Sequence, residues 1–281
     1  MEKKKVVASP ALYKTGLLRA SALFALLAAL TGSVGVGLLF SGEYRRFLVQ
    51  KLLTGGITAS SAVFTWQIIN STITVLGFLC PALLAVGLIR VLRKNPSGGF
   101  SFLANGFYGA FRIGKVIGIG LAVLFALRVV LFVIGCLGDP QAVMNLYSMV
   151  ISEGLMGVLA WFLYRNLLRF LDGAGDCCVN LAYTLSSGLI DDWSIPGSAE
   201  RGFLILGILC PGWALGQIVT VTIVVHHIQS YYSLIWATHP GEYLAAASLV
   251  FNGITCLLMC VYLRRYNRLC EWEKYQARRK A

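Results

Sequence analysis

Six apolar stretches, each long enough to cross a lipid bilayer, constrain this chain more than any other feature. A membrane-spanning helix needs about 20 mostly apolar residues. The span must be helical because nothing in the hydrocarbon core can satisfy open backbone groups. The stretches are residues 16–40, 71–92, 114–137, 141–164, 203–226 and 243–263. The sequence therefore predicts an all-α polytopic membrane protein, with six transmembrane helices forming one membrane domain over residues 1–281.

The charge distribution predicts the orientation of this bundle. The chain is 57% hydrophobic and only 13% charged, which argues against a soluble domain. A net charge of +12 could indicate nucleic-acid binding, but 20 of the 24 Lys and Arg residues flank the apolar stretches on one side. The positive-inside rule then places both termini on the cytoplasmic side of a plasma (inner) membrane. Arg45, Arg46 and Lys51 oppose this assignment, so the side of segment 41–70 is the weakest part of the topology.

Two segments outside the spans carry most of the remaining polar character. Residues 172–201 include five acids among glycines and serines, which predicts an irregular cytoplasmic loop with a short helix near residues 178–185. Residues 264–281 form a basic cytoplasmic tail. The aromatic-rich segment 98–112 is typical of the membrane interface.

A five-residue motif occurs in two of the predicted spans. Gly-Phe-Leu-Cys-Pro occupies residues 77–81, and Gly-Ile-Leu-Cys-Pro occupies residues 207–211. Proline removes a backbone donor and crowds the carbonyl four residues earlier. In both copies that earlier residue is glycine, Gly77 before Pro81 and Gly207 before Pro211, so both helices are expected to bend there.

The motif spacing raises the hypothesis of an internal repeat. The two motifs are 130 residues apart, and the same offset carries the first span onto the fourth and the third onto the sixth. Three spans per half would give a 3+3 inverted repeat, an arrangement used by secondary transporters with broken helices near the midplane. The alternative is coincidence, because membrane chains are rich in Gly, Leu and Cys.

Polar residues near the motifs do not distinguish a transporter repeat from a coincidence. Gln217 and Asn252, with several threonines, could line a midplane pathway for a neutral or amphipathic solute. The same side chains could equally form hydrogen bonds between helices. The small-residue pairs Gly114 with Gly118 and Gly212 with Gly216 are interpreted as helix packing inside the bundle.

Arg128 and Glu153 are the ionisable residues placed well inside predicted spans. Such groups are costly in lipid unless they are paired or face a cavity. Counted from the turn near residue 139, they lie at similar depths on neighbouring helices, which predicts an intramembrane ion pair. A proton or ion relay is the functional alternative.

No motif for catalysis, metal binding or a cofactor is recognisable. His226 and His227 are adjacent and cannot share a metal in the manner of an i, i+4 pair, and Asp172 and Asp176 lack the companions of a phosphotransferase. We therefore expect a non-catalytic accessory, assembly or regulatory component, with the bilayer and a membrane-protein partner as contacts and no nucleic acid. The alternatives are a small-solute transporter with its site at the kinked second and fifth spans, and an intramembrane enzyme.

Overall fold

The computed structural model describes residues 6–7, 16–39, 81–93, 96–136, 142–187, 189–190, 197–227 and 240–279. Within them, long helices account for almost all of the chain: α1 (Gly16–Leu39), the helix Pro81–Leu92, α4 (Pro96–Cys136), α5 (Ala142–Ser187), α6 (Gly197–His227) and α8 (Pro240–Arg279). A short antiparallel ladder joins β1 (Val6–Val7) to β2 (Leu189–Ile190). The predicted all-α class is confirmed.

The protein is a membrane protein by the length and composition of its helices. Three described segments are long and apolar enough to cross a bilayer: Gly16–Gly35, Gly197–Val219 and Tyr243–Trp272. The apolar helix Pro81–Leu92 is shorter, and the first part of the predicted second span, residues 71–80, lies outside the described residues. The number of spans therefore stays a prediction.

Two helices are much longer than the spans predicted within them. α4 has 41 residues and joins the predicted interfacial segment 98–112 to the third span without a break. α5 has 46 residues and continues through Ser187, so the short helix predicted near residues 178–185 is part of α5 and the irregular structure predicted for the preceding residues 172–177 is wrong. The chain stays helical there because a set of apolar side chains at helical spacing is buried: Phe170, Leu171, Ala174, Cys177, Cys178, Leu181 and Ala182.

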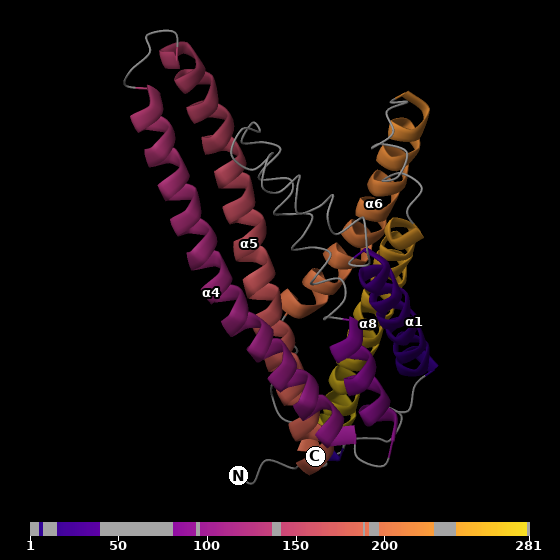
Figure 1. Cartoon of the computed structure of the whole chain (residues 1–281). Helices are drawn as coiled ribbons and strands as arrows, with labels where there is room; N and C mark the ends of the chain where they lie inside the picture. Colours follow the sequence, from indigo (N-terminus) through magenta and orange to yellow (C-terminus); the bar gives the residue numbers. More distant parts are fainter. Residues whose placement is uncertain are drawn as a thin grey trace.

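The helices pack in pairs, which Figure 1 shows as two groups that diverge from a common base. α1 runs along α8, where the Ser248 hydroxyl donates a 2.7 Å hydrogen bond to the Ala28 carbonyl and Phe24 packs against Phe251. α6 also packs on α8, and α4 packs on α5. The α4–α5 hairpin extends away from α6, so much of its surface faces outward.

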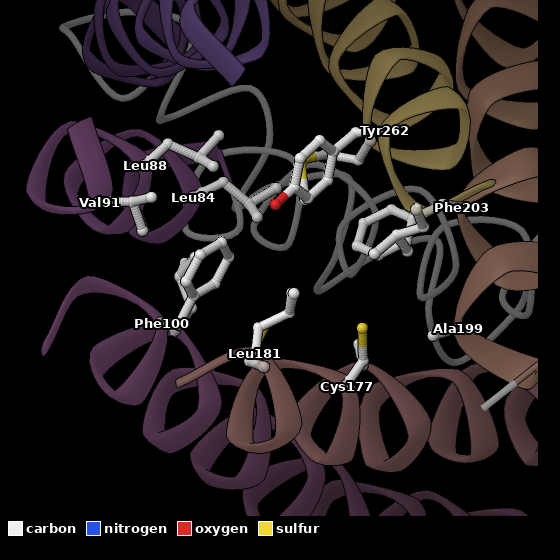
Figure 2. Packing of buried hydrophobic residues seen from close by; sticks show 14 of the residues in the cluster. Leu84, Leu88, Val91, Phe100, Cys177, Leu181, Ala199, Phe203 and Tyr262 are labelled. Atoms are coloured by element: carbon white, nitrogen blue, oxygen red, sulfur yellow. The ribbon is translucent and has the colours of Figure 1, made fainter. Parts of the chain in front are cut away.

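The largest hydrophobic core lies where these groups meet (Figure 2). In this view Leu84, Leu88, Val91 and Phe100 lie on one side of the cluster, Ala199 and Phe203 on the other, and Tyr262, Leu181 and Cys177 between them. We call these nine residues the base core. Because they come from the helix Pro81–Leu92 and from α4, α5, α6 and α8, the base core holds five helices in fixed positions.

Candidate functional site

Pro211 lies inside α6, as the sequence predicts, and it packs directly on α8. A β-carbon on Gly253 would lie 2.5 Å from Pro211 Cδ and 3.2 Å from the Gly207 carbonyl oxygen. A β-carbon on Gly207 would lie 2.6 Å from the Leu257 side chain. The second copy of the motif therefore forms a close helix–helix contact, in which glycine on each helix lets the other approach.

Asn252 is a buried polar residue of α8 that neighbours Gly253 in the sequence. It precedes Gly253 on α8, is only 9% exposed, and its Oδ1 atom has no hydrogen-bond partner within the described part of the structure. Gln217 lies half-buried on α6, six residues after Pro211. The midplane site predicted at the kinked second and fifth spans stays a prediction.

The first copy of the motif is only partly described. Pro81 is fully buried at the start of the helix Pro81–Leu92, whereas Gly77 lies outside the described residues. If the two halves were related by the 130-residue offset, Pro81 would pack on Val123 as Pro211 packs on Gly253. Val123 is instead 60% exposed, so this contact is not reproduced.

The pairing of whole helices agrees with the 130-residue offset better than the proline contacts do. The antiparallel pair α1–α8 would correspond to α5–α4, and both pairs are present. Adding 130 to Ala28 and subtracting 130 from Ser248 gives Val158 and Gly118, so the repeat predicts a contact between these two residues. The structure instead places Tyr164 against Gly118. The contact on α5 therefore lies six residues beyond the expected Val158. Because side chains on a helix lean toward its N-terminus, the Tyr164 hydroxyl reaches back toward the height of Val158 and the difference in position is smaller. The inverted repeat stays a prediction.

The predicted ion pair falls on side chains that are not described. Arg128 lies on α4 and Glu153 lies on α5, the two helices of the hairpin, but both side chains are outside the described part. The pairing therefore remains a prediction.

A tyrosine of the hairpin forms an interaction that the sequence analysis missed. The Tyr164 hydroxyl donates to the Gly114 carbonyl and accepts a 3.1 Å hydrogen bond from the Gly118 amide. These two groups are the i and i+4 partners of one α4 turn, so the predicted packing role of Gly114 and Gly118 is confirmed. Gly212 and Gly216 are different, since a β-carbon on either would meet nothing within 4 Å among the described atoms.

Polar groups at the base are either paired or inactivated by burial. Tyr108 donates a 2.5 Å hydrogen bond to Asp176, and burial together with this carboxylate raises the pKa of Tyr108 to about 12. Burial raises the pKa of the Cys177 thiol to about 12 and that of Cys178 well above its usual value. Both thiols stay protonated at neutral pH, so neither is an active nucleophile.

A salt bridge joins two helices at the base. Arg264 forms a salt bridge of 2.5 Å with Glu200, which joins α8 to the first turn of α6. Among the described side chains, no three His, Cys, Asp or Glu residues lie together as a metal site would require. Asp172 and Asp176 are exposed, while Asp191 and Asp192 lie outside the described residues.

Comparisons with known proteins leave the chain without relatives to guide its function. No protein-family model matches it, and no curated protein or solved structure is similar to it.

Proposed function

We propose that this protein is a non-catalytic accessory, assembly or regulatory component of the plasma membrane. In this proposal six helices cross the bilayer, both termini lie in the cytoplasm, and a partner protein docks on the base. The exposed basic residues at the base end of the helices, among them Arg93, Arg201 and Arg265, support a cytoplasmic base.

The observation that carries the proposal is the packed helical base itself. Segment 172–187 continues α5 and buries one face in the core, while Val179 and Tyr183 on its other face are 43% and 51% exposed. Asp172 and Asp176 are exposed on the same helix. A rigid surface with exposed apolar, aromatic and charged groups suits protein docking better than an irregular loop would.

Crosslinking from the base tests this proposal. A photoreactive amino acid at Val179 or Tyr183 in the native cells should give discrete protein adducts, and Val179→Asp should weaken copurification of the same protein. Leu155, 68% exposed on the hairpin, is the matched control position and should give lipid adducts. Identical adduct patterns at Leu155 and Val179 would contradict a partner site on the base.

A small-solute transporter is the second candidate, supported by the buried Asn252 of α8. The Asn252 amide oxygen has no partner among the described residues, which is costly in a low-dielectric environment, and a polar ligand would satisfy it. The close contact between Pro211 and Gly253 opposes an open pathway at this height. Solute uptake into proteoliposomes that Asn252→Leu abolishes, while Gly212→Ala leaves it intact, would favour this candidate over the accessory role.

A further inference from the structure

Four basic side chains gather on the α4–α5 hairpin, and we call them the basic strip: Arg112 and Lys115 of α4, and Arg165 and Arg169 of α5. All four are exposed. A β-carbon on Gly114 would lie 3.0 Å from Leu168 Cδ2, so Lys115 and Arg169, their neighbours in sequence, lie at the same height on the hairpin.

The Tyr108–Asp176 hydrogen bond shows which faces of the two helices adjoin. Arg112 follows Tyr108 by one helical turn, and Lys115 follows by about two. On α5, Arg169 and Arg165 precede Asp176 by about two and three turns. All four cations therefore lie on the side of the hairpin where Tyr108 meets Asp176.

The basic strip is free to bind an anion. None of its four side chains forms a salt bridge with any residue in the described ranges. Lys115 Nζ lies 4.2 Å from the centre of the Phe111 ring, and the Arg165 guanidinium carbon lies 5.2 Å from that of Trp161. Cations against aromatic rings keep their charge available, and aromatic rings are typical of the bilayer interface.

Beyond the cations the same faces become apolar. Ile119 and Val123 of α4 are 67% and 60% exposed, and Phe162, Val158 and Leu155 of α5 are 58%, 68% and 68% exposed. From Arg165 to Ile151 this surface extends about 20 Å, comparable to an acyl chain. Toward the base, Asp172 and Asp176 end the strip, so an anion is confined to the height of the four cations.

We propose that the basic strip and the apolar surface above it form a binding site for one anionic phospholipid. The four cations hold the phosphate of the headgroup by charge, because both guanidinium and ammonium groups donate charge-assisted hydrogen bonds to phosphate oxygens. The acyl chains lie along the exposed surface of α4 and α5. Along the hairpin, the apolar residues lie at the height of the acyl chains and the cationic residues at the height of the headgroup, with aromatic residues at the boundary between them.

The test counts lipids bound to the purified full-length protein in a neutral detergent by native mass spectrometry. Phosphatidylglycerol is the probe, and phosphatidylcholine of the same chain length is the zwitterionic reference. At about fivefold in affinity for each basic residue near an anionic surface, Arg165→Gln with Arg169→Gln should weaken phosphatidylglycerol binding about 25-fold. Arg165→Lys with Arg169→Lys should retain most of the binding and shows that the site tolerates substitution.

Two controls make the proposal falsifiable. Arg268→Gln with Arg279→Gln removes the same charge from exposed positions on α8 and should change the affinity less than threefold. An equal loss of affinity in that control would show that binding depends on net charge alone, which would contradict a specific site on the hairpin. Displacement of phosphatidylglycerol by equimolar inorganic phosphate would overturn the lipid assignment, because the acyl chains would then contribute nothing. If the double Gln variant does not fold, Lys115→Gln alone should weaken binding about fivefold, and unchanged binding would contradict the proposal.

Discussion

The Tyr164 hydroxyl accepts a hydrogen bond of 3.1 Å from the Gly118 backbone amide, which links the middle of α5 to the backbone of α4. Tyr164→Phe removes this link while keeping the ring, so it should lower the free energy of unfolding by about 1 kcal/mol. Gly118→Ala places a methyl group against the phenol and should cost about 1–3 kcal/mol. Thermal unfolding in detergent measures both, with Gly120→Ala as control because a β-carbon on Gly120 would meet nothing within 4 Å among the described atoms of other elements. Equal effects of the two glycine substitutions would contradict the contact.

The contact between Pro211 and Gly253 predicts a coupled pair. Gly253→Ala would bring a methyl group to 2.5 Å from Pro211 Cδ and should destabilise the α6–α8 pair by about 1–3 kcal/mol. Pro211→Ala removes the obstructing ring and should recover part of that loss, which a double-mutant cycle measures. Additive effects of the two substitutions would show that the residues are not in contact. Gly212→Ala, on the open side of α6, is the matched control.

The buried thiols predict a pattern of chemical reactivity. With a pKa of about 12, Cys177 has a thiolate fraction at pH 8 roughly a thousandfold below that of an ordinary cysteine. Maleimide labelling followed by mass spectrometry should therefore leave Cys177 and Cys178 unmodified in the folded protein and modify both after unfolding. Rapid labelling of either residue in the folded protein would contradict the burial.

The same thiols predict how stability depends on pH. Because burial raises both pKa values, their neutral form is favoured in the folded state. Their contribution is fully present below the ordinary thiol pKa of about 8.5 and is lost as pH rises toward 12. Cys177→Ala with Cys178→Ala should flatten this part of the stability profile, measured by denaturation between pH 7 and 11. An unchanged slope would show that the thiols do not contribute.

The ion pair predicted between Arg128 and Glu153 is tested by Glu153→Gln. Removing one partner of a pair buried in the bilayer leaves an uncompensated charge and should cost about 3–5 kcal/mol. Glu200→Gln breaks the partly exposed salt bridge to Arg264 and should cost no more than about 1 kcal/mol, which makes it a useful comparison. Unchanged thermal stability of Glu153→Gln in detergent would exclude the intramembrane pair.

The sequence predicts the elements inside the membrane better than those at the base. Long apolar stretches identify helices by composition alone, and Pro211 lies inside its helix as predicted. At the base, the glycines and acids that follow residue 171, Gly173 and Gly175 among them, favour a loop by composition. In the structure they face Ser198 and Tyr108 across close helix contacts, so they permit packing rather than end the helix.

A signal for the continuous α5 was nevertheless present in the sequence. Apolar residues recur at steps of three and four from Phe170 to Leu181, which is the pattern of a helix with one buried face. The acids Asp172 and Asp176 lie between them and are exposed. Which residues meet across two helices depends on tertiary geometry that no local pattern encodes. The contact of Tyr164 with two glycines of α4 is an example.

Because α5 is unbroken, a tilt of the helix about Phe170 as a pivot would move its far end much more than its base end. Phe170 packs edge-on against Phe203 with ring centres 5.0 Å apart, while the other end of the helix begins at Ala142, about 42 Å away along the axis. A tilt of about 10° at the pivot therefore displaces the far end by roughly 7 Å. A small rearrangement around Phe170 and Phe203 would thus be amplified at the other end of α5.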